Sequence, residues 1–289
     1  MAYGRRVSKG GRMVEKSEKQ KKLLICKKQN DWQIKCSIRL AELFPNANEK
    51  KRFKAKWKDF IKSDPNNKGV YKLNNEYLSY QSEQLVPSKK DKRPPLLLVL
   101  GNPATHSVKS GMFFSFEGDG NEHRFWKSIL KPSGILDLSF DTKQSVRELN
   151  KQRRASLLNL DYDSPFRVGL CVFISMPSAP GGIWGGIAGV QRLIGVRALR
   201  RLEQAETVRV LECAKKFLNP KGAIVTFQKN AWNSLRSVED PLYSIDLAKA
   251  GKLKGRLKNN TDIPLFGVPP TRLAGPCRDV LHKFVSGWH

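Results

Sequence analysis

The residues best placed to carry out chemistry stand in a short polar segment that follows an apolar run. Residues 96–100 are all apolar, and residues 101–104, Gly-Asn-Pro-Ala, are turn formers. The run predicts a strand buried on both faces, and the loop after such a strand is where α/β sheets hold their ligands. This loop offers the amide of Asn102, and an aromatic segment follows at residues 111–116. An amide can orient a water molecule but cannot take its proton as a carboxylate would.

Several other kinds of site are excluded by what the sequence lacks. The loop contains neither GxGxxG nor GxxxxGK[ST], so no nucleotide-phosphate cradle is expected. The five cysteines are scattered and include no C-x-x-C pair, which argues against a disulfide framework. The four histidines have no ligand-like spacing, so we expect neither a metal nor a cofactor.

The order of motifs resembles the uracil-DNA glycosylase superfamily, most closely the mismatch-specific uracil and thymine-DNA glycosylases. Those proteins have a strand, G-x-N-P-G, a phenylalanine-bearing loop, N-x-F-W-K-x-L and S-G-L. Here G-N-P-A stands at 101–104, G-M-F-F-S at 111–115, H-R-F-W-K at 123–127 and S-G-I at 133–135. The resemblance covers roughly residues 94–285. It implies an enzyme that flips a base out of DNA and hydrolyses the bond between that base and deoxyribose.

The resemblance implies a role for each residue of the first motif. Asn102 matches the asparagine that orients the attacking water, and Gly101 and Ala104 flank it at the base-binding site. Strict uracil enzymes place a bulky tyrosine at the position of Ala104, so a small residue leaves room for the thymine methyl group. Phe114 matches the phenylalanine that stacks on the flipped base, a contact worth roughly 1–3 kcal/mol.

Other interpretations of these residues stay open at this point. Asn102 could simply close a turn before proline, as Asn-Pro pairs often do. Phe113 or Phe116, rather than Phe114, could face the pocket. His106 and Ser107 could bind a DNA phosphate or cap the next turn.

A second motif is expected near the C-terminus, where residues 269–274 resemble the H-P-S-x-x loop of the family. Thr271 would bind phosphate, Arg272 would contact the neighbouring strand, and Leu273 would insert into the vacated base stack. Pro269 stands where the family has a histidine that steadies the leaving base. Proline has no ring nitrogen or N–H to offer, so help for the leaving group must come from elsewhere or be weaker.

The charge of the chain predicts a polyanionic partner. It carries 53 Lys and Arg against 26 Asp and Glu, a formal net charge of +27, and the excess is densest in residues 1–95. We expect the protein to bind DNA through phosphate contacts. Double-stranded and single-stranded DNA are both candidates. A lysine-rich surface that merely aids solubility is the alternative.

Location is inferred from hydrophobic patterning. No apolar run approaches the roughly 20 residues that span a bilayer, and residues 1–11 lack the apolar middle of a signal peptide. We expect a cytoplasmic monomer, associated with the nucleoid in a prokaryote or nuclear in a eukaryote, with no membrane partner.

The apolar runs and the segments between them predict the fold class. Strands are expected at 96–100, 167–174, 223–227 and 264–268. Helical spacing is found between them, with a helix at 123–130, another within 141–160, and two within 187–218 that break near 204–206. Strands separated by helices predict a three-layer α/β/α fold around a central, mainly parallel four-stranded sheet.

The N-terminal third is expected to be a basic, partly helical extension. Residues 1–20 predict a mobile arm, and residues 49–63 an amphipathic helix with an aromatic stripe and a lysine-rich outer side. Packing of that stripe on the main domain is favoured over DNA contact. Residues 87–95 have the composition of a linker, so the boundary is placed between an extension at 1–93 and a glycosylase-like domain at 94–289.

Three functions remain open from the sequence. The resemblance favours a monofunctional, water-mediated DNA glycosylase of base excision repair that acts on uracil or a related damaged or mismatched base. Covalent imine chemistry would need an amine, and no lysine lies within the matched loop motifs 101–104, 111–115 or 269–274. The alternatives are a noncatalytic nucleic-acid-binding protein with a glycosylase-like fold and an unrelated α/β hydrolase or transferase that acts on nucleotides.

Overall fold

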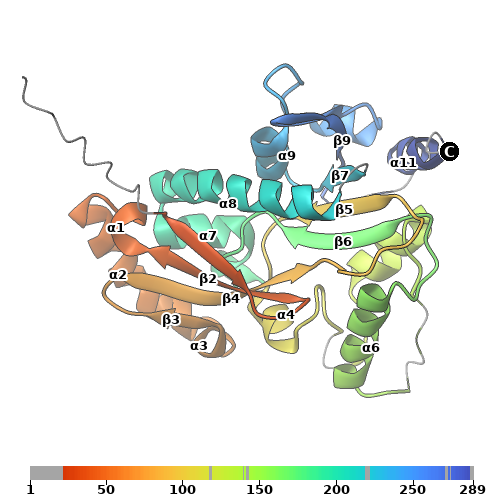
Figure 1. The fold of residues 1–289 in the computed structure, drawn as a ribbon. Helices are drawn as coiled ribbons and strands as arrows, with labels where there is room; N and C mark the ends of the chain where they lie inside the picture. The colour runs from red at the N-terminus through yellow and green to blue at the C-terminus, as the bar shows by residue number, and fades with distance from the viewer. Residues whose placement is uncertain are drawn as a thin grey trace, which may run out of the picture.

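The chain folds into an α/β structure built on one mixed, open sheet (Figure 1). The computed structural model describes residues 22–116, 119–138, 140, 143–218, 222–270, 273 and 275–286. Within these residues the sheet has nine strands in the order β1-β2-β4-β6-β5-β7-β9-β8, and β3 pairs with β4. The strands are β1 (Leu24–Lys28), β2 (Gln33–Arg39), β3 (Tyr71–Leu73), β4 (Tyr77–Leu85), β5 (Pro95–Leu100), β6 (Arg167–Val172), β7 (Ala223–Thr226), β8 (Lys254–Leu257) and β9 (Asn260–Gly267).

Helices connect and cover these strands. Two segments depart from α-helical geometry, the π-helix η1 (Phe125–Leu130) and the 3₁₀-helix η2 (Gly182–Trp184). The α-helices are α1 (Leu40–Leu43), α2 (Ala47–Lys62), α3 (Asn67–Val70), α4 (Thr105–Ser110), α5 (Lys131–Ser133), α6 (Val146–Asn159), α7 (Gly186–Ile194), α8 (Val196–Phe217), α9 (Lys229–Leu235), α10 (Ile245–Lys249) and α11 (Pro276–Ser286).

The sheet is mixed and larger than the four-stranded one expected. Parallel pairing joins β6 to β5, β5 to β7 and β7 to β9, and these strands lie in the four apolar runs of the sequence. Antiparallel strands extend both edges, with β8 at one and β1 to β4 at the other. The antiparallel strands were not expected because their apolar residues are sparse and, in β2, alternate with polar ones.

Strand β5 separates two hydrophobic clusters, which explains why its sequence is uniformly apolar. Leu97 and Val99 belong to one cluster, with residues of α7, α8 and α9. Leu96, Leu98 and Leu100 belong to the other, with residues of η1, α6 and α11. Because successive side chains point to opposite faces, a strand covered on both faces needs apolar residues at every position. Figure 1 shows the long helix α8 and the helix α6 on different sides of β6.

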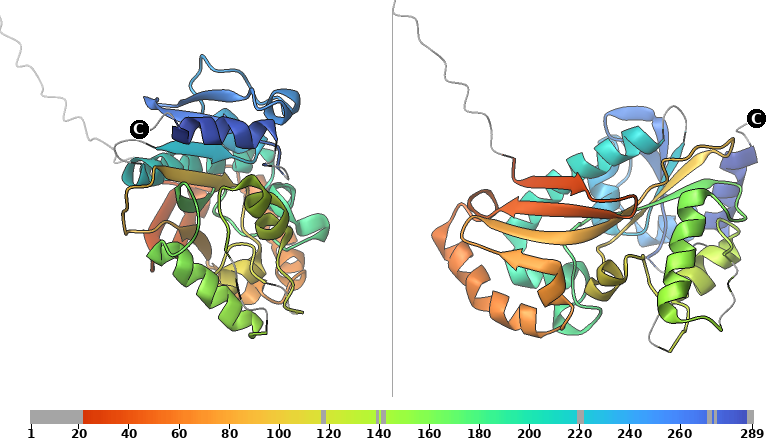
Figure 2. Two further views of the ribbon diagram at one scale, coloured as in Figure 1. Left: turned by 90° about the vertical axis from the view of Figure 1, so that its right-hand side faces the viewer. Right: turned by 60° about the horizontal axis from the view of Figure 1, so that its bottom comes forward.

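The N-terminal segment is part of the sheet and does not form the separate extension expected at 1–93. Gln84 and Leu85 of β4 pair with Cys171 and Leu170 of β6, and residues of β2 and β4 share a hydrophobic cluster with α8. Figure 2 shows these red and orange elements grouped at one end of the molecule and α6 at the other. The linker composition of 87–95 therefore marks a connection between two strands of one sheet. The arm expected at 1–20 lies outside the described residues.

Helix α2 confirms the amphipathic helix expected at 49–63 and shows where its aromatic stripe goes. The helix begins after Asn46, whose side chain accepts a hydrogen bond from the Asn48 amide at 2.7 Å. Phe53 and Phe60 are buried, and Phe60 lies 5.4 Å from the ring of Tyr71. The stripe thus packs on the rest of the protein, as the sequence favoured.

The helices expected within 187–218 are found, but they break at a different residue. Gly195 separates α7 from α8 with a φ of 88°, a conformation that glycine adopts without strain. The break expected near 204–206 is wrong, because those residues lie inside α8. Polar residues there serve a buried network and do not end the helix.

A disulfide joins two neighbouring strands. Cys26 of β1 stands directly opposite Cys36 of β2, with their Cα atoms 4.1 Å apart. This pair corrects the expectation, drawn from the scattered cysteines, that disulfides are absent. The two positions become neighbours only through the register of β1 and β2. Cys171, Cys213 and Cys277 are buried and form no disulfide within the described residues.

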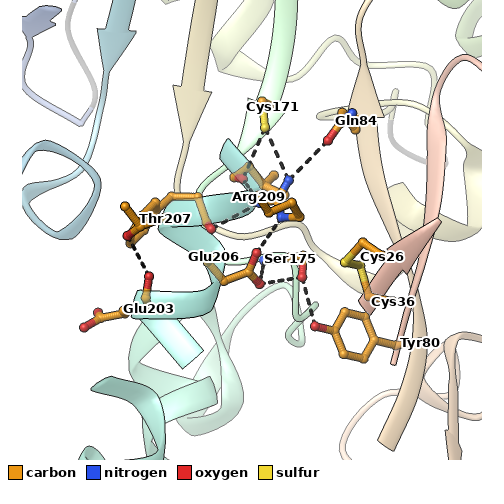
Figure 3. Close-up of polar contacts among 12 residues, drawn as sticks. Cys26, Cys36, Tyr80, Gln84, Cys171, Ser175, Glu203, Glu206, Thr207 and Arg209 are labelled. Atoms are coloured by element: carbon orange, nitrogen blue, oxygen red, sulfur yellow. Dashed lines mark hydrogen bonds and ion pairs between the residues drawn. A yellow bond between two sulfur atoms is a disulfide. The ribbon is translucent and has the colours of Figure 1, made fainter. Parts of the chain in front are cut away.

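A buried ion pair connects α8 to the strands at the middle of the sheet (Figure 3). Glu206 is fully buried, and its carboxylate accepts from Nε of Arg209 at 2.5 Å. The Arg209 guanidinium also donates to the main-chain oxygen of Phe173 at 3.2 Å and to the side chain of Gln84 at 3.2 Å. One residue therefore bonds to both β4 and the end of β6.

The same carboxylate holds the loop that follows β6. The amide of Ser175 donates to Glu206 Oε1 at 2.6 Å, and the Ser175 hydroxyl contacts the same oxygen at 2.5 Å. Tyr80 of β4 lies 2.9 Å from that hydroxyl. The loop after β6 thus starts from a position defined by charged hydrogen bonds, which are about twice as strong as neutral ones.

Removal of the Glu206 carboxylate should destabilise the whole fold. Glu206→Ala leaves Arg209 and the Ser175 amide buried without their partner, and breaking a buried pair in this way costs about 3–5 kcal/mol. Urea unfolding should therefore show a lower midpoint than for the wild type. Glu212→Ala changes an exposed residue of the same helix and should stay within about 0.5 kcal/mol. Equal midpoints for the two variants would contradict this role of Glu206.

Candidate functional site

The candidate site lies where β5 and β6 end side by side. The loop after β5 and the loop after β6 continue the parallel pairing of the two strands through an isolated bridge between Ala104 and Ser178. The Thr105 amide donates to the Ser178 oxygen at 3.0 Å, and the Ser178 amide donates to the Pro103 oxygen at 3.0 Å. These bonds fix the two loops relative to each other, so that both can line one cavity.

A cavity of about 270 Å³ opens between these loops and brings together most of the residues expected from the first motif. Asn102, Ala104, His106, Ser107 and Phe114 all line it. This volume lies near the lower end of small-molecule pockets, roughly 300–1,000 Å³. It therefore suits a single base better than a dinucleotide.

Asn102 is partly buried and bonds across the site. Its Nδ2 donates to the main-chain oxygen of Met176, on the loop after β6, at 3.3 Å. This bond directs the amide toward the neighbouring loop and leaves Oδ1 as the side chain's acceptor. Gly101, which precedes it, accepts a bond from the Ile174 amide at 3.0 Å and positions Asn102 without lining the cavity itself.

The aromatic wall of the cavity is held in an uncommon backbone conformation. Phe114 has a φ of 44°, in the left-handed region that residues other than glycine rarely adopt. Its ring stacks on His123 at 4.7 Å and on Phe125 at 4.2 Å between centroids, and Trp126 Nε1 donates to its main-chain oxygen at 2.9 Å. Such strain persists only where the surroundings enforce it, and it is concentrated at functional sites.

The three phenylalanines of this segment have different environments. Phe113 and Phe116 are 2% and 5% exposed, whereas Phe114 is only partly buried. Phe113 and Phe114 both line the cavity, together with His123, which the sequence did not single out. The helix expected at 123–130 is present as η1, and Phe125 is buried as expected.

An arginine behind the aromatic wall supports the segment. Arg153 of α6 is buried, lies 4.1 Å from the ring centroid of Phe116 and 4.5 Å from that of Trp126, and pairs with Glu122. Burial lowers the pKa of Arg153 to about 10, so it remains charged at neutral pH. The cation therefore joins α6 to Phe116, which lies two residues after Phe114, and to Trp126 of η1.

His106 and Ser107 lie in the first turn of α4, which begins at Thr105. They are therefore within the helix, and the capping role left open by the sequence does not apply, because the N-cap position is Ala104 and no side chain bonds there. His106 Nε2 and the Ser107 hydroxyl are 3.3 Å apart. Ser107 is 3% exposed and lines the cavity.

Glu83 is the residue of this cavity that the sequence did not indicate. It lies on β4, is 2% exposed, and lines the cavity with Asn102. Burial raises the pKa of its carboxyl well above the ordinary value. No pattern in the sequence could have found it, since β4 was not recognised as a strand of the sheet that carries the first motif.

The second expected motif is only partly visible. Thr271 and Arg272 lie outside the described residues. Leu273 is 1% exposed and belongs to the hydrophobic cluster of η1 and α11, so in this structure it packs in the core and is not the exposed wedge expected. Burial stabilises an apolar side chain next to a core. The sequence alone does not distinguish a leucine packed in the core from a leucine exposed to insert into DNA. Pro269 is buried.

A second cavity, of about 310 Å³, lies elsewhere and contains none of the motif residues. It is lined by both basic and acidic side chains, including Arg167, Arg209 and Glu212, and by Cys213. Size alone does not make it the better candidate. The smaller cavity is preferred because it combines convergent polar groups with an aromatic wall at the carboxyl ends of parallel strands.

Comparisons with known proteins give no assignment for this site. No protein-family model and no curated protein matches the sequence significantly. Across the described part of the chain, no cluster of three His, Cys, Asp or Glu side chains could hold a metal ion, and no helix is long and apolar enough to cross a bilayer. The functional assignment therefore depends on the side chains of the cavity.

The loop that carries Asn102 should depend on a buried hydrogen bond from Thr105. Its hydroxyl donates to the carboxylate of Asp64 at 2.5 Å, and both residues are buried. Thr105→Val leaves that carboxylate oxygen without its donor and should destabilise the protein by about 1–3 kcal/mol. Thr207→Val, which loses only a bond to its own helix at Glu203, is the control, and urea unfolding is the measurement. A smaller effect at Thr105 than at Thr207 would contradict this.

Proposed function

We propose that this protein is a DNA glycosylase that hydrolyses the N-glycosidic bond of uracil or a related damaged or mismatched base. The observation that carries the proposal is the convergence of Asn102, Ala104 and Phe114 on one cavity of base-compatible volume, about 270 Å³. All three are residues that the first motif of the sequence predicts at the base-binding site. The two hydrophobic clusters on opposite faces of β5 support the finer proposal of a three-layer α/β/α arrangement.

The chemistry asked of the site has three parts. The base must leave the stack, a water must be held against C1′ of the sugar, and the negative charge on the departing base must be stabilised. In the proposal, the Asn102 amide orients the water while its Nδ2 stays bonded to Met176. Phe114 and His123 supply the surface on which the base stacks, and Ala104 leaves room for a substituent on the base.

Binding to DNA is proposed from charge and from the mouth of the cavity. A chain of net charge +27 is attracted to phosphate without regard to sequence. His106 and Ser107 at the cavity are proposed phosphate contacts, with Thr271 and Arg272 as further ones. The reaction proposed for these residues needs no cofactor, and we propose that the protein acts as a monomer.

A noncatalytic nucleic-acid-binding protein is the second candidate, and one observation favours it. Pro269 stands where the resembling family has a histidine, and it is buried in this structure. Such a protein would keep the basic surface and the cavity but would not release a base. An enzyme acting on free nucleotides is distinguished in the same assay by its substrate.

Replacing Asn102 should abolish most base release without abolishing DNA binding. Groups that activate a reactant in this way contribute about 10²–10⁴-fold, and Asn102→Ala should lose a factor in that range. The substrates are labelled duplexes with U·G, T·G, hypoxanthine·T or U·A pairs and single-stranded DNA with uracil. Asn48→Ala, at an exposed asparagine of α2, is the matched control.

The outcomes separate the candidate functions. Release by the wild type and by Asn48→Ala, with loss in Asn102→Ala, supports the glycosylase. Tight DNA binding with no release from any substrate contradicts the glycosylase and supports the binding protein. Activity on free nucleotides but not on polymers would support the third class.

A further inference from the structure

The side chain of Glu83 is buried at the cavity, and one of its two carboxyl oxygens, Oε1, has no hydrogen-bond partner among the described residues. Its Oε1 has no contact with solvent and no hydrogen bond within the part of the chain that the structure describes. No ion pair among those same residues involves Glu83. Burying an unsatisfied polar group costs about 1–3 kcal/mol, so a residue of this kind needs an explanation other than stability.

No cation of the described residues forms an ion pair with Glu83. On β2 the residue opposite is the neutral Gln33. On β6 Cys171 stands opposite the adjacent Gln84, whose side chain accepts a hydrogen bond from Arg209 of α8. From α4 and from the segment before η1, His106 and His123 line the same cavity. Desolvation therefore dominates, and it raises the pKa of the Glu83 carboxyl well above its ordinary value. Burial therefore favours the protonated form of this carboxyl, the form that can donate a proton.

The strand order places Glu83 across the cavity from Asn102. Strand β6 lies between β4 and β5, and adjacent strands are about 4.8 Å apart, so the β4 and β5 backbones are roughly 10 Å apart. Val172, near the end of β6, lines the cavity between the two residues. The separation of the two strands leaves room for a flat base between Asn102, which would hold the water, and Glu83, which would contact the base.

We propose that Glu83 donates a proton to the leaving base during cleavage of the N-glycosidic bond. This inference rests on the proposed function and supplies the leaving-group help that Pro269 cannot give. The bond between C1′ and the base nitrogen breaks, and its electron pair stays on the base. The Glu83 proton passes to the base, the oxygen of the water held by Asn102 bonds to C1′, and the proton released by that water returns to the Glu83 carboxylate through solvent. Atoms and charge balance without another reactant.

Glu83→Gln tests this with little change in shape. In single-turnover assays, wild-type release should fall as pH rises through the raised pKa of Glu83, because only the acid form donates. The variant should lose about 10²–10⁴-fold at neutral pH and should not show that fall. Glu76→Gln, at an exposed residue just before β4, is the matched control and should behave as the wild type does.

A change of leaving group separates proton donation from a merely structural effect. The anion of 5-fluorouracil is more stable than that of uracil and needs less protonation as it leaves. The defect of Glu83→Gln should therefore shrink on 5-fluorouracil in DNA. A structural defect would slow both bases equally, and that result would overturn the inference. Equal urea midpoints for Glu83→Gln and the wild type serve as the folding check.

Infrared spectroscopy gives a readout that does not depend on activity. The wild type at neutral pH should show the carbonyl band of a protonated carboxylic acid. That band should be missing from Glu83→Gln and from Glu83→Leu, a control without a side-chain carbonyl. Absence of that band in the wild type overturns the inference. If the wild type releases no base from any DNA, the proposed function fails; if release is normal in Glu83→Gln, only the role of Glu83 fails.

Discussion

The buried pairing of Glu206 with Arg209 is the interaction on which the arrangement of the sheet and the cavity depends. Arg209 bonds to Gln84 on β4 and to main-chain oxygens at the end of β6, while Glu206 receives the amide of Ser175. A charge in this position is costly unless its partners are in place, so the network tolerates little displacement of α8. The network therefore fixes the position of the loop after β6 and of β4, the strand that carries Glu83, relative to the same helix, α8.

The cavity combines contributions from distant parts of the chain. Asn102 comes from the loop after β5, the aromatic wall from the segment before η1, and Glu83 from β4. The main-chain bonds between the loops after β5 and β6, and the contacts of Arg153 with Phe116 and Trp126, hold these parts in place. Rigid support of this kind is what a site needs if it is to orient a water and a base together.

Two features of the cavity are energetically unfavourable, and both lie where chemistry is proposed. Phe114 has a φ of 44°, and one carboxyl oxygen of the buried Glu83 has no hydrogen-bond partner among the described residues. Each reduces stability, and neither is required to complete the core. Features that cost stability and converge on one cavity are better explained by function than by folding.

The sequence by itself determined the elements whose signals are local. The apolar run of β5, its turn, the aromatic segment and the amphipathic helix α2 are readable because burial on both faces or on one face leaves a periodic pattern. Tertiary structure alone decided that β4 pairs with β6, that Cys26 faces Cys36, that Leu273 packs in the core and that Glu83 reaches the cavity. These depend on pairings between residues far apart in the chain, where register and strand order are set by the packing of whole elements and leave no trace in local spacing.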